Sequence, residues 1–191
     1  MCKNEKNIYK NMVVITNRKL VDGDLTDQVA KIAKLRPGGL ILREKDLSDA
    51  EYRRLAIPIR QICLESDIDF YIHSRFRVAA EIGCENLHVS ISALREIPKD
   101  QKIRSLCVSC HSPEDVQTAI KYKASRIVLG TIFETDCKPG LAGRGIAFVR
   151  EICQQCPIPV YAIGGVKESN LPLLMEAGAS GGCMMSGFMQ L

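Results

Sequence analysis

Eight short segments rich in β-forming residues alternate with amphipathic helical patterns along nearly the whole chain. Such alternation is typical of βα units that build a parallel sheet. Eight parallel strands favour a closed barrel over an open flavodoxin-like sheet, which needs only about five strands. We therefore predict an α/β fold of the compact TIM (β/α)8 barrel type, formed by one domain over residues 1–191. The predicted strands are 12–16, 39–43, 69–73, 86–89, 104–110, 126–130, 159–163 and 180–185.

The chain ends too soon after the last predicted strand to complete the barrel's outer layer. Only residues 186–191 follow that strand, so the eighth helix is predicted to be missing or truncated. A strip of the last and first strands would then be uncovered, and exposed apolar strips usually mark an interface. We predict that a homodimer partner or the N-terminal tail covers this strip. Helical patterns occupy 25–35, 47–64, 75–82, 113–122, 145–155 and 167–176, with a shorter one near 91–97.

Composition excludes several classes of protein. No apolar segment approaches the roughly 20 residues of a membrane span, and the polar start lacks the apolar core of a secretory signal. We therefore expect a cytoplasmic protein with no membrane contact. The net charge of +4 is modest, and five Tyr, five Phe and no Trp offer few stacking surfaces, so we expect no nucleic-acid partner.

Nine cysteines raise the question of a metal or disulfide framework. Cys107 and Cys110 lie in a predicted strand, where positions three apart point to opposite faces and cannot share a metal. Cys153 and Cys156 share a helix face, but they lie too far along the chain to complete a four-cysteine zinc site. We interpret the cysteines as reduced, buried, small apolar side chains and predict no metal site.

Glycines and a serine follow the seventh and eighth predicted strands. In barrels of this type the site lies at the carboxyl ends of the strands, and these two loops often hold a phosphate. Paired glycines let backbone N–H groups approach an anion, and a serine hydroxyl adds a donor. Tight turns alone would also explain them. We predict phosphate binding by Gly164, Gly165, Ser186 and Gly187.

Basic residues follow two other predicted strands. Arg43 and Lys45 lie at the end of the second strand, where they can bind substrate. The partner of Arg43 is predicted to be Glu44, a substrate carboxylate or a phosphate. The segment 131–145 is long and glycine-rich, which is typical of a functional lid. Lys138 and Arg144 on that segment can close over an anion.

Three histidines lie near the predicted strands. His73 ends the third strand and His111 follows the fifth, so both can reach the mouth of the barrel. His88 lies within the fourth strand and is predicted to be a core or wall residue. The mouth histidines are candidate proton carriers because imidazole titrates near neutral pH.

Six motifs follow one another along nearly the whole chain: VVIT, LREKD, VSCHSPEDV, LGTIFETDCKPGLAGRG, AIGGV and MMSG. Together and in this order they resemble the thiamin phosphate synthase/TenI superfamily. The resemblance implies a TIM barrel that binds a small phosphorylated thiazole in thiamin biosynthesis. The synthases of this superfamily join a pyrimidine diphosphate to thiazole phosphate, whereas TenI-like tautomerases aromatise a thiazole carboxylate phosphate without a metal.

Departures from the synthase pattern favour the tautomerase. In the synthases Mg²⁺ is held by aspartates in two motifs, and here Ser74 and Ala93 occupy those positions. A hard cation needs charged oxygen ligands, which neither residue supplies. Ile41 also replaces the glutamine that usually precedes LREK. The sequence therefore predicts no cofactor, with magnesium required only under the synthase alternative.

The tautomerase pattern has a departure of its own. Its general acid/base is a histidine after the sixth strand, where this chain has Thr131. A threonine hydroxyl is a poor base, so His73, His111 or Cys137 would have to carry the proton. We predict a TenI-like thiazole tautomerase with His73, His111 and Thr131 at the catalytic centre. A thiamin phosphate synthase and a non-catalytic, regulatory phosphate-binding barrel are the alternatives.

Overall fold

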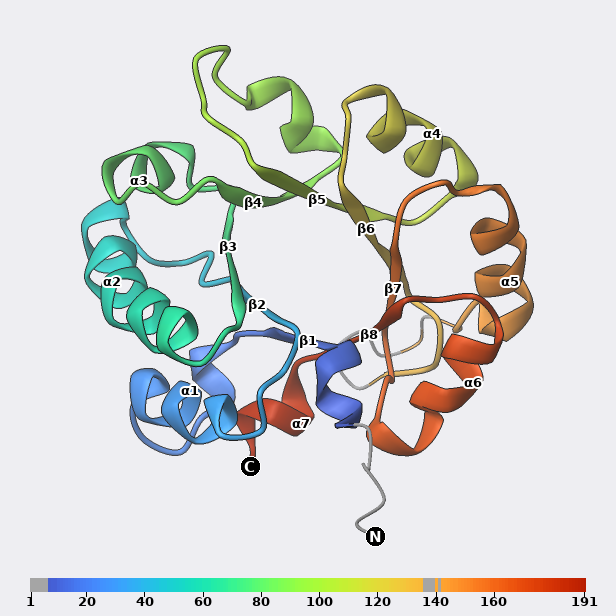
Figure 1. Cartoon of the computed structure of the whole chain (residues 1–191), viewed down its shortest axis with the longest axis horizontal. Coiled ribbons are helices and arrows are strands. Elements are labelled where there is room, and N and C mark those ends of the chain that lie inside the picture. Colours follow the sequence, from blue (N-terminus) through green and yellow to red (C-terminus); the bar gives the residue numbers. More distant parts are fainter. Residues whose placement is uncertain (1–6, 136–139, 141) are drawn as a thin grey trace, which may run out of the picture.

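A computed structural model describes residues 7–135, 140 and 142–191 of the chain. Eight parallel strands close into a barrel in sequence order, with β8 paired to β1 (Figure 1). All eight predicted strands are confirmed, with ends shifted by at most one residue. The strands are β1 (Met12–Ile15), β2 (Gly39–Leu42), β3 (Asp69–His73), β4 (Asn86–Ser90), β5 (Ser105–Cys110), β6 (Arg126–Gly130), β7 (Val160–Ile163) and β8 (Gly181–Met184).

Helices surround the barrel, as the sequence predicts (Figure 1). Sequence signals set several helix starts: Ser48 and Glu51 form a capping box, and Pro113 follows the capping Ser112. The pattern near 91–97 forms a single 3-10 turn rather than an α-helix. The helices are α1 (Leu25–Ala33), α2 (Asp49–Glu65), α3 (Phe76–Glu81), α4 (Pro113–Lys121), α5 (Gly145–Gln155), α6 (Leu171–Glu176) and α7 (Ser186–Met189), with 3-10 turns η1 (Ile8–Asn11), η2 (Arg18–Leu20), η3 (Ser92–Glu96) and η4 (Glu168–Asn170).

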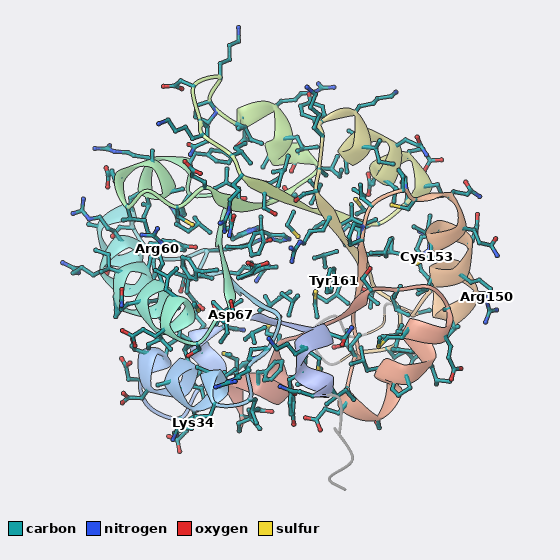
Figure 2. All side chains as sticks on the ribbon, viewed as in Figure 1. Lys34, Arg60, Asp67, Arg150, Cys153 and Tyr161 are labelled. Atoms are coloured by element: carbon teal, nitrogen blue, oxygen red, sulfur yellow. The ribbon has the colours of Figure 1, made fainter. Side chains whose placement is uncertain are left out.

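Strand side chains alternate between two hydrophobic clusters. The larger cluster packs between the strands and the helices, and the smaller one fills the barrel, where Val13, Ile15 and Ile41 meet. Figure 2 shows strand side chains, Tyr161 among them, directed into the barrel, while Arg150 points away from it.

The cysteines follow the same alternation. Cys107 belongs to the inner cluster and Cys110 to the outer one, so the prediction that they face apart is confirmed. The seven described cysteines are free thiols, and burial raises the pKa of the Cys107 thiol to about 12. Such thiols behave as small apolar side chains rather than as nucleophiles.

The amino-terminal end of the barrel interior is closed by a cation. Arg126 forms an ion pair with Asp69 at 3.2 Å. Its guanidinium also lies 5.1 Å from the ring centroid of Tyr71 and 5.6 Å from that of Tyr161. These contacts satisfy a charged group inside the barrel, since an arginine there needs both a counter-ion and a stacking surface.

The truncated eighth helix is confirmed, and the strip that it would leave uncovered is covered within the chain, which agrees with the N-terminal alternative rather than with the homodimer. α7 is only four residues long, yet Phe188 and Met189 are 0% and 1% exposed. Tyr9 of η1 lies against Phe188 with ring centroids 6.1 Å apart, and every residue of β1 and β8 is buried. Short elements from both ends of the described chain therefore cover these strands, and the homodimer loses the surface that motivated its prediction.

None of the helices within residues 7–135 and 142–191 is both long and apolar enough to cross a bilayer.

Candidate functional site

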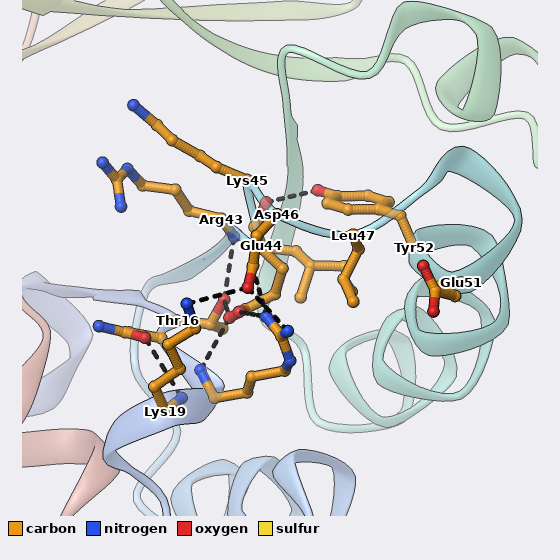
Figure 3. A network of polar contacts seen from close by, with 12 residues as sticks. Thr16, Lys19, Arg43, Glu44, Lys45, Asp46, Leu47, Glu51 and Tyr52 are labelled. Carbon is orange, nitrogen blue, oxygen red and sulfur yellow. Dashed lines mark hydrogen bonds and ion pairs between the residues drawn. The ribbon is translucent and has the colours of Figure 1, made fainter.

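A buried carboxylate organises the carboxyl ends of β1 and β2 (Figure 3). The Glu44 side chain is 2% exposed. It accepts hydrogen bonds from the Thr16 hydroxyl at 2.7 Å, the Arg18 backbone N–H at 3.0 Å and the Arg18 guanidinium at 3.1 Å. Arg18 also makes two hydrogen bonds, at 2.6 and 2.9 Å, with Asp46. This network fixes the loop after β1 against the loop after β2.

Arg43 does not pair with Glu44, which corrects one of the partners expected for it. Glu44 faces Thr16 and Arg18, whereas Arg43 extends to the other side of the strand, beside Lys45 (Figure 3). Only the backbone N–H of Arg43, donating to Thr16 Oγ1 at 2.9 Å, has a recorded partner among the described residues. Arg43 as a residue is half-buried.

Two histidines meet on adjacent strands, His73 as the last residue of β3 and His88 in the middle of β4. His73 and His88 are register partners on these strands, and their Nδ1 atoms lie 2.9 Å apart. The Nε2 atom of His88 lies 2.9 Å from the Ser109 hydroxyl on β5. The prediction that His88 is a wall residue is confirmed by its 3% exposure, but its bond to His73 was not foreseen.

Both histidines are neutral near pH 7. Burial, followed by the charges of Arg43 and Lys45, lowers the pKa of His73 to about 4. Burial and the proximity of His73 also lower the pKa of His88 well below its ordinary value. Desolvation and neighbouring cations both disfavour an imidazolium. The charges of Arg43 and Lys45 act on both rings, so the two cations lie on the same side of the barrel as the histidine pair.

His111 and Thr131 occupy a second part of the mouth. His111 Nδ1 lies 2.6 Å from the carbonyl oxygen of Gly130. A carbonyl only accepts, so this nitrogen carries the proton. Thr131 is 6% exposed and lies against Gly164. The structure records no hydrogen bond that links His111 or Thr131 to the His73–His88 pair within the described chain.

The glycines after β7 are required by their conformation and their neighbours. Gly164 and Gly165 have φ values of 99° and 60°, which glycine adopts at little cost. A Cβ would overlap Thr131 at Gly164 and the Glu134 carbonyl at Gly165. Their N–H groups donate no recorded hydrogen bond to another described residue. Free backbone donors beside a tight glycine turn suit an anion.

Neighbouring residues hold this glycine turn in place. The Gly164 carbonyl accepts from Phe133 N–H at 3.0 Å. Asn170 Nδ2 donates to the Gly165 carbonyl at 2.9 Å, while its Oδ1 accepts from Lys167 N–H at 2.8 Å. On the adjacent strand end, Ser186 and Gly187 are exposed at the start of α7.

The expected lid is only partly described. Lys138 and Cys137 lie outside the described residues. Arg144 is engaged by its own chain: its guanidinium lies 3.7 Å from the Phe148 ring centroid and donates to the His111 carbonyl. Arg144 therefore ties the end of this segment to the loop after β5 rather than standing free over the mouth.

Sequence reasoning missed Ser109 and Arg18 at this site. Ser109 lies one alternation beyond Cys107, the register partner of His88, so its contact depends on strand register. Arg18 lies on a 3-10 turn that no hydrophobic period predicts. Strand alternation predicts that His73, His88 and Ser109 each point into the barrel. That they contact one another could be predicted only with the register of the three strands known.

The molecule is a closed (β/α)8 barrel, and its glycine turns and cationic side chains lie at the end of the barrel where this class of fold places its sites. Within that class, residues 12–188 match the family model described as thiamine monophosphate synthase. The chain belongs to this family.

Curated relatives support the same family at modest identity. The chain is 28% identical to a thiamine-phosphate synthase of Coprothermobacter proteolyticus, covering 92% of this chain and 85% of that protein. It is 29% identical to the Clostridium tetani thiamine-phosphate synthase, with 95% and 88% coverage. It is 28% identical to the putative thiamine-phosphate synthase 2 of Aquifex aeolicus, with 94% and 97% coverage.

A solved structure confirms the fold. The thiamine phosphate pyrophosphorylase from Pyrococcus furiosus superposes with a TM-score of 0.82 at 24% identity, over 97% of this chain and 90% of that one. FabK from Thermotoga maritima shares the barrel at a TM-score of 0.63 and 15% identity. At such identities the likeness concerns architecture, because one barrel supports many chemistries.

Proposed function

We propose that this chain is an enzyme of thiamin biosynthesis of the thiamine-phosphate synthase type, which joins a pyrimidine diphosphate to a thiazole phosphate. The observation that carries the proposal is the family match over residues 12–188, together with relatives that bear this name over nearly their whole length. These names favour the synthase over the TenI-like tautomerase that the sequence suggested.

The charge at the mouth supports binding of two phosphorylated substrates. Arg43 and Lys45 follow β2 on the same side of the strand, and Gly164 and Gly165 offer backbone donors after β7. Arginine binds phosphate oxygens through two parallel N–H donors, which a lysine cannot reproduce. Arg43 is therefore proposed to bind the diphosphate, and the glycine turn with Ser186 and Gly187 to bind the thiazole phosphate.

Magnesium does not fit the residues at the family's metal position. Ala93 is 8% exposed and its methyl group packs in the outer hydrophobic cluster. Ser74 offers only a neutral hydroxyl. Across residues 7–135 and 142–191, His, Cys, Asp and Glu side chains form no group of three that could hold a metal ion. The proposal consequently assigns neutralisation of diphosphate charge to Arg43 and Lys45 rather than to a metal.

The test is a condensation assay on the full chain with the pyrimidine diphosphate and thiazole phosphate. Product should form with Mg²⁺ and still form in EDTA. Arg43→Met should lower kcat/KM by more than tenfold, equivalent to about 1.4 kcal/mol, and Arg43→Lys should recover part of the loss. Arg53→Met is the matched control, because Arg53 lies on α2 and pairs with Glu81. Absence of product under both conditions would rule the synthase out.

The tautomerase is a second candidate, and the His73–His88 pair favours it. A neutral imidazole at the mouth can move a proton on a thiazole ring without a metal. The test is proton NMR of the full chain with the dearomatised thiazole carboxylate phosphate in EDTA. Isomerisation that His73→Gln abolishes and His111→Gln spares would establish this reaction with His73 as the proton carrier. Loss in His111→Gln alone would move the role to His111, and binding without turnover in both assays would indicate a binding protein.

A further inference from the structure

Side chains from three adjacent strands form one hydrogen-bonded chain across the inner wall of the barrel. His73 on β3 contacts His88 on β4 through their Nδ1 atoms, and His88 contacts Ser109 on β5 through Nε2. Both links are 2.9 Å long. The second nitrogen of His73, Nε2, has no recorded partner among the described residues. This hydrogen-bonded series therefore begins at Ser109 in the wall and ends at the unpaired Nε2 atom of His73, near Arg43 and Lys45.

Because both imidazole rings are neutral, the protons of the His73–His88–Ser109 series can be placed in only two ways. Each ring then has one N–H and one bare nitrogen, so one Nδ1 atom donates across the His73–His88 contact and the other accepts. If His73 donates, His88 Nε2 donates to Ser109 Oγ. If His88 donates, its Nε2 accepts from the Ser109 hydroxyl, and His73 carries its proton on Nε2.

Satisfaction of donors decides between the two arrangements. In the first, the Ser109 hydroxyl proton has no acceptor among the described residues, since His88 is the recorded partner of this oxygen. In the second, the hydroxyl proton and the His88 proton both have acceptors, and the proton left over is the one on His73 Nε2. Ser109 and His73 are both half-buried, so the position of the unpaired donor decides: the second arrangement leaves it on His73 Nε2, beside Arg43 and Lys45, where an anionic ligand can accept it.

We propose that Ser109 and His88 are positioning residues that hold His73 in its Nε2–H tautomer, so that the barrel presents a neutral hydrogen-bond donor to an anionic ligand beside Arg43 and Lys45. The tautomer is a property of the free protein. Its use on a thiazole substrate rests on the proposed function, whereas its existence does not.

The test is nitrogen-15 NMR of the histidine rings in the uniformly labelled full chain at pH 7. The chain has three histidines, and His111 provides an internal reference for a protonated Nδ1 because that atom donates to the Gly130 carbonyl. We expect His73 with a protonated Nε2 and a bare Nδ1, and His88 with the opposite arrangement. A protonated Nδ1 on His73, or a charged ring at either residue, overturns the proposal.

Variants of Ser109 test whether its hydroxyl influences the tautomer of His73 through His88. Ser109→Ala removes the hydroxyl that donates to His88, so the Nε2–H population of His73 should fall although Ser109 does not touch His73. Ser109→Thr keeps a hydroxyl and should restore it. Ser105→Ala is the matched control, because Ser105 is also on β5 but contacts the Tyr71 hydroxyl at 2.9 Å. An unchanged His73 ring spectrum in Ser109→Ala would refute the influence of Ser109 on the His73 tautomer.

The nitrogen-15 assignment tests the tautomer of His73 independently of any catalysed reaction. The wild-type assignment needs neither substrate nor variant, so it decides the tautomer even if Ser109→Ala does not fold or both activity assays fail. In whichever assay succeeds, Ser109→Ala should lower kcat with KM little changed, and Ser109→Thr should recover it, because a positioning residue acts through His73 rather than on the substrate.

Discussion

Glu44 carries a buried charge whose partners are all donors. The Thr16 hydroxyl, the Arg18 N–H and the Arg18 guanidinium surround it. Glu44→Gln keeps the shape but removes the charge and places an amide N–H₂ among donors, so at least one donor loses its acceptor. We expect the free energy of unfolding to fall by about 1–3 kcal/mol, measured by urea denaturation.

Asp46→Asn is the comparison for Glu44→Gln, because Asp46 also pairs with Arg18. The Asp46 side chain is 45% exposed, and exposed ion pairs contribute about 0–1 kcal/mol. If Asp46→Asn proved as costly as Glu44→Gln, burial of Glu44 would not be what makes its network important.

At the level of single residues, the sequence located the positions of the site better than their partners. Arg43 was placed at the end of the second strand, where the structure has it, but Glu44, one of its expected partners, binds Arg18 instead. His88 was correctly assigned to the wall, yet its bond to His73 was missed. Strand alternation tells which face a side chain takes, whereas a contact between strands also requires the register and the loop conformations.

The turn after β7 can be tested with two glycines of nearly equal φ. Gly165 and Gly83 have φ values of 60° and 62°, so an alanine at either pays a similar penalty of about 1–2 kcal/mol. A Cβ at Gly83 meets nothing within 4 Å, whereas one at Gly165 overlaps the Glu134 carbonyl and approaches Phe133. Gly165→Ala should therefore be clearly more destabilising than Gly83→Ala in urea denaturation.

The same pair separates structure from phosphate binding. Gly165→Ala should also weaken binding of inorganic phosphate in isothermal titration calorimetry, and Gly83→Ala should leave it unchanged. Equal stability and equal phosphate affinity in the two variants would remove both the packing argument and the predicted phosphate role of this turn.

Among elements, the strands were predicted well and the short turns were not. Each strand is a compact run of β-forming residues bounded by turns, which gives a clear period. The 3-10 turns η1 and η2 are only three or four residues long, too short to show a period. The pattern 167–176 divides into η4 and α6, because Asn170 bonds back to Lys167 N–H and to the Gly165 carbonyl instead of capping the helix.

For the molecule as a whole, α7 covers the two strands at which the barrel closes. Phe188 is 0% exposed and packs against Tyr9, joining the two ends of the described chain. Phe188→Ala should lower the free energy of unfolding by about 3–5 kcal/mol. Leu191→Ala, at a residue 55% exposed, should change it by less than about 0.5 kcal/mol. A small effect of Phe188→Ala in urea denaturation would mean that α7 does not seal β1 and β8.

Global stability should depend on pH through the buried histidine pair. The folded pKa of His73 is about 4, below its ordinary value of 6.5, and that of His88 is also lowered. Between these values the unfolded chain binds more protons than the folded one, so stability falls as pH falls from about 6.5 toward 4. The carboxylates with lowered pKa, such as Glu51 and Glu81, lose their contribution only at lower pH.

The interval from pH 7 to pH 5 therefore isolates the histidines. The urea midpoint of the wild type should drop across it, and the drop should shrink in the double variant His73→Asn, His88→Asn. His111→Asn should retain the full drop, because the His111 ring lies on an exposed residue outside the pair. A pH-independent wild type would mean that the pair is not held neutral by burial, and the donor role proposed for His73 would lose its basis as well.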